Sequence, residues 1–353
     1  MIRPFVFAGL TTRVVFGHGT LAQVPEEVAR MGRSRPLVLS TPQQADQAQA
    51  LAGQLGKQAA GVFAEAAMHT PVDVTERAVA VFRDSGADCV VAFGGGSTTG
   101  LGKAIATRTG ADQLVVPTTY AGSEMTDILG ETADGEKVTR RDPSIRPEVV
   151  VYDVDLTLGL PVGMTMTSAL NAIAHAMEGL YAPDRNPVTE ALSRDALKAF
   201  ATALPVLRDT PHDPQARAQA LYAAWGCSTA LGYVQMALHH KLAHVLGGSF
   251  GLPHAETHAI LLPHTTAYNE VAVAGLLAPI RDTFGHASAG AGLWHFARDI
   301  GAPLRLSELG LSEADLDRAT EIAVKNPYEN PREITRAGIR QLLQDAWEGS
   351  EPA

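Results

Sequence analysis

The sequence predicts an α/β dinucleotide-binding domain followed by an all-helical domain. Two observations carry this prediction. Short β-rich runs alternate with helical stretches in the first part of the chain, as expected for a doubly wound parallel sheet. After Pro161, alanine, leucine and histidine recur at helical spacing and the β-branched runs disappear. We therefore place a nucleotide-binding domain at residues 1–157 and an all-helical substrate domain at residues 158–353.

The predicted strands of the first domain are apolar on both faces, which is typical of parallel strands covered by helices. They lie at residues 36–40, 61–66, 89–96, 114–119 and 149–153. Helices are expected near residues 20–31, 43–57, 72–86 and 97–108. The N-terminal stretch is expected to form edge strands. Residues 127–140 predict a hairpin whose turn is centred on Asp134-Gly135.

The composition of the chain argues against binding to nucleic acids or membranes. The chain has 353 residues, 46% of them hydrophobic, and a net charge of −10, so it offers no basic footprint for nucleic acid. No apolar run reaches the roughly 20 residues needed to span a bilayer. Cys89 and Cys227 stand in apolar surroundings and are expected to be buried free thiols of a reducing compartment. We expect a cytoplasmic protein that binds neither nucleic acid nor membranes.

A glycine-rich loop follows the strand at residues 89–96 and opens a helix. Glycine lets backbone N–H groups approach an anion, and a helix N-terminus favours negative charge. The spacing differs from G-x-G-x-x-G, and a tight strand-to-helix turn is the plainer alternative. The candidate cofactor contacts in this loop are Gly94, Gly95, Gly96, Ser97, Thr98 and Lys103.

Two further strand ends are expected beside this loop. Thr118, Thr119 and Ser123 follow the next strand, and two such loops together favour a dinucleotide. The first strand ends at Ser40 and Thr41, where a carboxylate would bind ribose hydroxyls and repel a 2′-phosphate. The sequence therefore leaves NADH and NADPH both open.

Six of the twelve histidines fall between His239 and His264. Asn171 and His175 lie four residues apart on one predicted helix, and His240 and His244 repeat this spacing on another. A glycine-rich break then returns the chain to His254. We expect His175, His240, His244 and His254 to converge. His239, His258 and His264 are expected to be packing or capping residues.

These motifs carry a family resemblance. The glycine loop, "PTT..GSE", the "N-x-x-x-H" helix and the "H-x-x-x-H…P-H" segment resemble, in this order, the iron-containing (group III) alcohol dehydrogenases. Within that family, "HHKLAHVLGGSFGLPHAETHAILLPH" and "NPYENPR" are similar to segments of the maleylacetate reductases. The resemblance covers essentially the whole chain. It implies the dehydroquinate synthase-like fold, a cleft between two domains and a homodimer.

The resemblance also implies a site built like a metal centre. The family's metal ligands, one Asp and three His, carry over to Asn171, His175, His240 and His254. Asn171 replaces the one anionic ligand, and Lys241 stands where the broader family usually has glycine. Both changes oppose cation binding, although three neutral histidines can hold zinc. We therefore expect a vestigial site in which no metal is required.

The implied reaction is NADH- or NADPH-dependent reduction of the C=C bond of 2-maleylacetate to 3-oxoadipate, a step in aromatic-compound degradation. In this hypothesis His244 or His254 supplies the proton or stabilises an enolate, with His175 and His240 beside them. Lys241 and Arg332 are candidates for the substrate carboxylates. The remaining candidates for lining the substrate pocket are Tyr120, Asn171 and Tyr328.

Three alternatives stay open on the sequence. A metal-dependent alcohol or lactaldehyde-type dehydrogenase of the same fold would contain iron or zinc and lose activity with a chelator. A lyase like dehydroquinate synthase would need a metal and several basic residues in a sugar-phosphate pocket. A non-catalytic nucleotide-binding regulator would have no use for four clustered histidines.

Overall fold

The structure is a computed structural model that describes residues 5, 7–9, 11–133, 136–325 and 328–353. The chain divides into two compact units, with the division between Leu160 and Pro161. The sequence placed this division at residue 157. Phe7 belongs to the helical unit rather than to the sheet unit, and its ring packs 4.9 Å from the ring of Tyr233.

The sheet unit contains a six-stranded parallel sheet in the order β1-β8-β5-β4-β2-β3. Its strands are β1 (Arg13–Gly17), β2 (Pro36–Leu39), β3 (Gly61–Phe63), β4 (Cys89–Gly94), β5 (Asp112–Pro117) and β8 (Val149–Asp153). The helices between them are α1 (Val24–Arg30), α2 (Ala45–Leu55), α3 (Val72–Asp84) and α4 (Gly96–Thr109). The predicted doubly wound α/β fold is confirmed.

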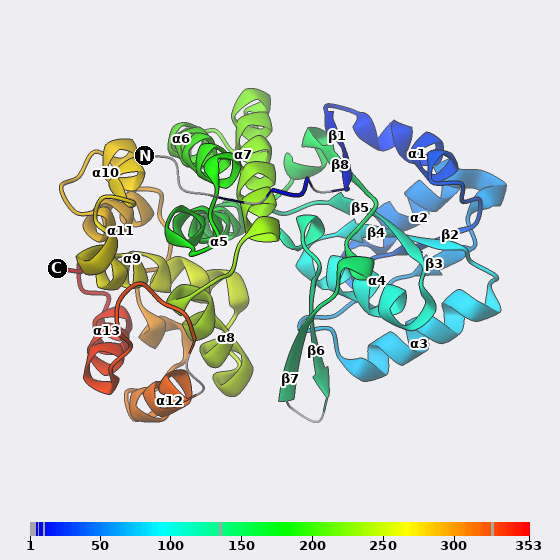
Figure 1. Cartoon of the computed structure of the whole chain (residues 1–353). Helices are drawn as coiled ribbons and strands as arrows, with labels where there is room; N and C mark the ends of the chain where they lie inside the picture. Colours follow the sequence, from blue (N-terminus) through cyan, green and yellow to red (C-terminus); the bar gives the residue numbers. More distant parts are fainter. Residues whose placement is uncertain (1–4, 6, 10, 134–135, 326–327) are drawn as a thin grey trace. The chain divides into compact units, whose positions relative to one another are not determined.

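Alternate residues of β4 point to opposite faces of the sheet, and each face is covered by helices (Figure 1). Val91 and Phe93 belong to a core cluster that also contains residues of α1 and α2. Val90 and Ala92 face α4 at Gly102, whose missing side chain lets the helix approach closely. This two-sided burial explains why β4 is apolar throughout.

A two-stranded antiparallel hairpin, β6 (Ile128–Ala133) and β7 (Glu136–Arg141), is inserted before β8. This confirms the predicted hairpin. The predicted turn at Asp134-Gly135 lies outside the described residues.

The second unit is helical throughout the residues described in it, as predicted. Its helices are α5 (Val162–Tyr181), α6 (Pro187–Asp209), α7 (Pro214–Tyr233), α8 (Leu238–Phe250), α9 (His254–Val273), α10 (Ala278–Phe284), α11 (Ala289–Asp299), α12 (Asp315–Val324) and α13 (Arg336–Glu348). None of the described helices combines the length and apolar character that crossing a bilayer requires.

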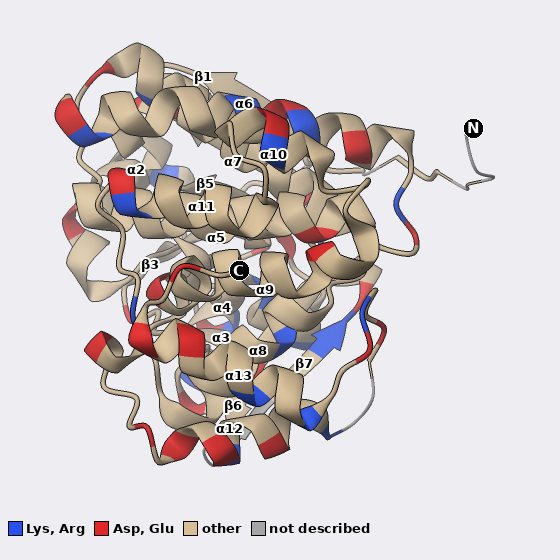
Figure 2. Cartoon of the chain, turned by 90° about the vertical axis from the view of Figure 1, so that its left-hand side faces the viewer, with Lys and Arg blue, Asp and Glu red and all other residues tan. Residues whose placement is uncertain are grey.

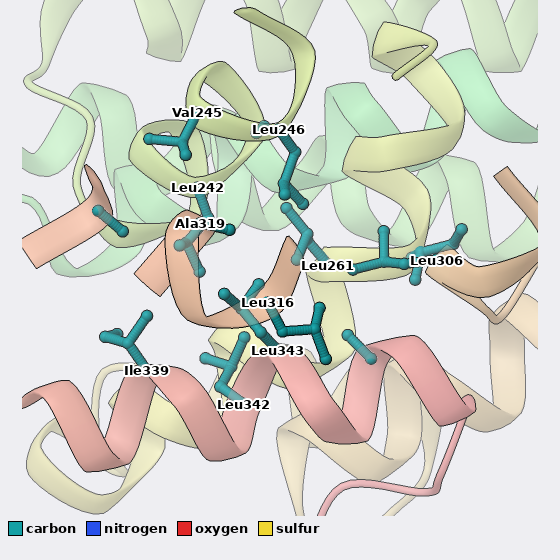
Figure 3. Packing of buried hydrophobic residues seen from close by; sticks show 14 of the residues in the cluster. Leu242, Val245, Leu246, Leu261, Leu306, Leu316, Ala319, Ile339, Leu342 and Leu343 are labelled. Atoms are coloured by element: carbon teal, nitrogen blue, oxygen red, sulfur yellow. The ribbon is translucent and has the colours of Figure 1, made fainter. Parts of the chain in front are cut away.

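Leucines orient α8 in this unit. Leu242 and Leu246 pack into a core shared with α12 and α13, as Figure 3 shows, together with Leu316 and Leu343. Leu242 and Leu246 lie four residues apart on one face, whereas His240 and His244 have the same spacing on another face. Burial of the leucine face therefore decides where the histidines point.

Charge is dispersed over this unit. Acidic and basic positions are interspersed along the ribbon in Figure 2, and α12 carries Asp315, Asp317 and Glu321. With a net charge of −10, the overall field repels an anionic substrate. An anion therefore needs a local cation within its pocket.

Candidate active site

The glycine loop joins β4 to α4 and has no room for side chains. Gly94 has φ 152°, and an added Cβ would lie 2.4 Å from the Thr98 hydroxyl oxygen. An added Cβ on Gly95 would lie 2.9 Å from the hydroxyl oxygen of Thr119. Gly96 begins α4. This is a bare backbone cradle at a helix N-terminus, and it fits a phosphate group.

Neighbouring strand ends meet at this loop. Thr118 donates its backbone N–H to the carbonyl of Gly94 at 3.0 Å, so the loops after β4 and β5 are joined. Gln44, from the connection after β2, donates its side-chain amide to the Thr118 hydroxyl at 3.1 Å. Sequence analysis did not single out Gln44, although its place after the first strand end was a usable signal.

The hydroxyl residues of these loops differ in exposure. Ser97 and Thr119 are half-buried, and Thr118 and Thr98 are buried. The Thr98 hydroxyl lies against Gly94 and has no hydrogen-bond partner among the described residues. Thr98 therefore shapes the loop, whereas Ser97 is placed to meet a ligand.

Lys103 is fully buried, and its ammonium group does not extend toward the glycine loop. It donates to the carbonyls of Ser123 and Ile128, at 2.6 and 2.9 Å, and to the hydroxyls of Ser123 and Thr126. Burial lowers the pKa of Lys103 to about 7. These contacts correct its predicted role as a phosphate or ribose contact, because its donors are already used to hold residues 123–128.

Two other predicted residues of the sheet unit are fully buried. The Ser40 hydroxyl has no hydrogen-bond partner among the described residues, and Tyr120 has no exposed surface. Direct contact of either side chain with a ligand would therefore need a local rearrangement.

The helical unit brings together the four histidines that were predicted to converge. It adds His239 and His258, which were predicted only to pack. Asn171 and His175 lie on α5, one turn apart, and both are buried. The neighbouring histidines on α8 are His239, His240 and His244, and those on α9 are His254 and His258. We call the six histidines of this group, His175, His239, His240, His244, His254 and His258, the histidine cluster.

The rings of the cluster are in contact. The His240 ring stacks at 5.1 Å from the His175 ring and lies 6.2 Å from the His244 ring. The His258 ring lies 5.1 Å from the His240 ring and 4.4 Å from the His254 ring. His258 therefore joins His240 to His254, which sequence analysis missed because a histidine one turn beyond His254 is also common in packing.

Glu178 is the carboxylate of this region, and it was not predicted. It is fully buried on α5, one turn after His175. Its oxygens accept hydrogen bonds from His240 Nδ1 at 2.7 Å, from the backbone N–H groups of Ala237 and His239, and from the Tyr181 hydroxyl. Glu178 therefore fixes the first turn of α8 and orients the His240 ring. The spacing from His175 was the only signal of this role.

Exposure rises across the cluster. His175, His239, His240 and His258 are buried, whereas His244 and His254 are exposed. Burial lowers the pKa of His175 and of His258 well below the ordinary histidine value. His175 and His258 are therefore neutral near pH 7, and His244 and His254 are the exposed histidines of the cluster.

Lys241 and Tyr328 lie together. The Lys241 ammonium lies 5.6 Å above the centre of the Tyr328 ring, a cation–π contact that holds the charge near this aromatic residue. Arg332 is engaged differently: it stacks 4.1 Å from the Tyr268 ring and donates to the Tyr268 carbonyl at 3.1 Å. Both Tyr328 and Arg332 line a cavity of about 250 Å³. Of the two predicted cations, Lys241 is the less constrained by structural contacts.

The donor atoms of the cluster were tested against the metal site that the resemblance implies. Asn171 supplies only a neutral amide where an anionic ligand would be. Among the residues described, the one set of three His, Cys, Asp or Glu donor atoms within 4.8 Å of one another is His286, His295 and Glu351, outside the cluster. The cluster therefore keeps the three histidines of an Asp-and-three-His metal site and lacks its one anionic ligand.

Comparison with known proteins agrees with this architecture. Residues 11–154 match the family model "Iron-containing alcohol dehydrogenase", and residues 165–347 match "Fe-containing alcohol dehydrogenase family, C-terminal". The chain is 58% identical over 351 residues to a maleylacetate reductase of Rhizobium sp. (strain MTP-10005), covering 99% of this chain and 100% of that one. It is 49% identical to maleylacetate reductase 1 of Rhodococcus opacus, covering 99% and 98% of the two chains.

Solved structures give the same result. The crystal structure of maleylacetate reductase from Agrobacterium tumefaciens superposes with a TM-score of 0.96 at 59% identity, covering 99% of this chain and 100% of that chain. This chain belongs to the iron-containing alcohol dehydrogenase family, in the group that includes the maleylacetate reductases.

Proposed function

We propose that this protein is an oxidoreductase that reduces the C=C bond of maleylacetate to give 3-oxoadipate, with NADH or NADPH as the reductant. The observation that carries the proposal is the 58% identity to a maleylacetate reductase over the full length of both chains. Lys241, a half-buried cation on the same helix as His240 and His244, supports a dicarboxylate substrate. The metal-dependent alcohol dehydrogenase alternative is the less favoured, because Asn171 removes its anionic ligand.

The reaction adds one hydride and one proton across the double bond. A nicotinamide held by the glycine loop would supply the hydride, for the carbon β to the ketone. Electron density then moves onto the ketone oxygen as an enolate. A donor N–H of His244 or His254 stabilises that oxygen, and a proton delivered to the α carbon completes the product. Lys241 pairs with a substrate carboxylate.

The cofactor is assigned to the sheet unit. Gly94, Gly95 and Gly96 would hold its pyrophosphate at the start of α4, with Ser97 as a hydroxyl donor. The end of β2 carries Ser40 and Thr41 and lacks a carboxylate that would repel a 2′-phosphate. We therefore propose that both nicotinamides are accepted.

We further propose that no metal ion takes part. Polarising a simple aldehyde or alcohol needs a Lewis acid, whereas the conjugated ketone of maleylacetate passes its charge to an oxygen that N–H donors can stabilise. The missing anionic ligand at Asn171 and the cation at Lys241, next to His240 in the sequence, support this assignment. A cytoplasmic location, expected from the composition of the chain, and a homodimer, implied by the resemblance, belong to the same proposal.

The test is NADH oxidation followed spectrophotometrically, with maleylacetate or with simple aldehydes, before and after EDTA treatment. Metal analysis of the purified protein accompanies it. We expect turnover of maleylacetate that EDTA does not reduce. Turnover of aldehydes without turnover of maleylacetate would contradict the proposed substrate. Loss of maleylacetate turnover in EDTA, restored by a divalent metal, would contradict only the metal-free assignment.

A further inference from the structure

Three metal-binding side chains meet on the helical unit outside the histidine cluster. His286 lies in the connection between α10 and α11, His295 lies on α11, and Glu351 follows α13. One donor atom of each lies within 4.8 Å of a donor atom of the other two. His295 Nε2 is 3.0 Å from Glu351 Oε1, although the two residues are 56 positions apart in the sequence. The fold therefore brings together two imidazoles and a carboxylate that sequence analysis did not single out.

Helix ends fix the backbone at two of these residues. His286 directly follows Gly285, the left-handed residue that ends α10. Glu351 comes two residues after Gly349, which ends α13 in the same conformation, and the next residue, Pro352, is buried. Both side chains therefore start from defined backbone positions, which lowers the ordering cost of binding a ligand.

Gly292 makes room for the His286 side chain beside α11. A Cβ added at Gly292 would lie 3.0 Å from His286 Cβ and 3.9 Å from His286 Cγ. Gly292 and His295 are three residues apart, so they lie on one face of α11. The rings of His286 and His295 lie 5.3 Å apart, with 31° between their planes. The missing side chain of Gly292 therefore lets one imidazole approach the other.

The present contacts of these side chains can give way to an ion. None of the three residues is buried. The Ser288 backbone N–H donates to His286 Nδ1 at 3.2 Å, the long end of the hydrogen-bond range, so exchanging this contact for a metal bond costs little. Bonds of about 2.1 Å place the ligand atoms of a tetrahedral ion about 3.4 Å apart, so small side-chain rotations complete the geometry. Glu351 supplies a negative charge, which the histidine cluster lacks at Asn171.

We propose that His286, His295 and Glu351 bind one Zn²⁺ ion, which joins α11 to the segment after α13. Imidazole nitrogens and a carboxylate oxygen are ligands that Zn²⁺ takes in proteins, and water supplies the fourth. Mg²⁺ and Ca²⁺ prefer sites made of oxygen alone. The ion closes a segment of 56 residues between His295 and Glu351. With three partly exposed protein ligands it exchanges with the medium, so it is taken up from solution. This site goes beyond the proposed function and takes no part in the reaction.

The test is a Zn²⁺ titration of the whole protein against a competing chromophoric chelator, after treatment with EDTA and removal of the EDTA. His295→Gln removes one ligand. We expect it to weaken Zn²⁺ binding by roughly 100-fold or more, because even an outer partner of a metal ligand is worth about 10- to 100-fold. His18→Gln is the matched control and should bind as wild type does. His18 Nδ1 also lies 2.7 Å from a carboxylate oxygen, of Asp155, but the pair belongs to no three-donor group among the described residues.

A second pair of variants separates this site from the histidine cluster, whose three histidines also bind Zn²⁺ if the cluster is a working metal site. His254→Gln weakens any binding there, and the double variant His254→Gln/His295→Gln is compared with it. We expect His254→Gln to keep a binding event that the double variant loses. Equal Zn²⁺ binding by these two variants would overturn the proposal, and so would a wild-type protein that binds no Zn²⁺.

Thermal unfolding gives an independent readout. Added Zn²⁺ should raise the Tm of wild type and of His254→Gln, because an ion that binds only the folded chain stabilises it. It should not raise the Tm of His295→Gln or Glu351→Gln, and Mg²⁺ should have no effect on any of them. Gly292→Ala keeps all three ligands but displaces His286, so its Zn²⁺ affinity should fall by roughly 10-fold. A Tm increase with Zn²⁺ that is the same in wild type and His295→Gln would contradict the assignment.

Discussion

At the scale of single residues, the site depends on the hydrogen bonds and ring contacts that each polar group makes. Glu178 has four donors on its two oxygens and is fully buried, so it holds one defined position. Lys241 makes a cation–π contact with Tyr328 and is half-buried, so its charge is partly desolvated and is available to an anion. Mutations at Glu178 and at Lys241 should therefore have different kinetic effects.

Replacing Lys241 by Met removes the cation while keeping most of the length of the side chain. A hydrogen bond to a charged group contributes about 1.5–3 kcal/mol, so we expect the KM for maleylacetate to rise by about 10- to 100-fold. The KM for NADH should stay the same. Lys241→Arg should recover part of the loss because it restores the charge. Steady-state kinetics check this, and an unchanged KM for maleylacetate in Lys241→Met would remove Lys241 from substrate binding.

Glu178→Gln replaces an acceptor oxygen with an amide N–H group. The His240 ring then loses its partner on Nδ1, and we expect kcat to fall by roughly 10- to 100-fold, with a smaller change in KM. The measurement is kcat and KM for maleylacetate, alongside circular dichroism to verify folding. Because Glu178 also accepts from the backbone of Ala237 and His239, the unfolding free energy should fall as well. A folded variant with the wild-type kcat would show that His240 needs no orientation by Glu178.

At the scale of elements, the glycine loop before α4 and the loop after β5 are held by different means. The glycine loop needs the absence of side chains, because Thr98 and Thr119 occupy the space beside Gly94 and Gly95. The loop after β5 needs a buried cation, because Lys103 donates to oxygens at three positions between residues 123 and 128. Mutations in these two loops should therefore have different effects on stability.

The Gly94→Ala variant should have a strained backbone conformation and a steric clash at the added Cβ. The residue has φ 152°, and the added Cβ would lie 2.4 Å from the Thr98 hydroxyl. We expect a loss of about 1–3 kcal/mol in unfolding free energy and a higher KM for NADH. The control is Gly53→Ala in α2, where the added Cβ meets nothing within 4 Å and should stabilise the chain by about 0.5–1 kcal/mol. Urea unfolding and NADH kinetics measure both effects. Equal behaviour of the two variants would contradict the argument.

Lys103 should give the stability of the chain a particular pH dependence. Its pKa is about 7 in the folded chain, where burial lowers it from the ordinary lysine value of 10.5, so between these pH values the unfolded chain binds more protons. The unfolding free energy of wild type should therefore rise, relative to Lys103→Met, as the pH increases from 7 toward 10.5. Below pH 7 the difference should be constant. Denaturant unfolding at several pH values checks this, and Lys198→Met, at an exposed lysine, should show no such slope.

At the scale of the whole molecule, two units carry separate tasks. The sheet unit, residues 8–160, contains the glycine loop proposed to bind the cofactor, and the helical unit contains the histidine cluster and Lys241. A ligand that binds only the folded protein stabilises it by about 2.7 kcal/mol at 100 times its Kd. Thermal unfolding can therefore report on cofactor and metal independently of turnover.

We expect NADH and NADPH each to raise the Tm, and EDTA to leave it unchanged. A bound metal would be linked to folding in the same way as a cofactor, so its removal would lower the Tm. Differential scanning fluorimetry with each nicotinamide, and with EDTA, is the measurement. A rise with NADH alone would show that the end of β2 rejects the 2′-phosphate. A drop in Tm on chelation would point to a structural metal.

The sequence by itself determined the fold class, the strand and helix order, and the candidate site on α5, α8 and the start of α9. Local pattern suffices for these, because a buried parallel strand must be apolar throughout and a helix repeats its face every three or four residues. The sequence alone likewise shows that Asn171 replaces the family's acidic ligand.

Only the tertiary structure decided what the individual side chains do. Glu178 and His258 became site residues because helices distant in the sequence pack so that one partner meets another, and no local spacing encodes that contact. Lys103 was predicted to reach a phosphate, but burial against residues 123–128 uses its donors there. The hydrogen bonds that join His258, His239 and Thr265 exist only once α8 and α9 are packed, because their partners come from both helices.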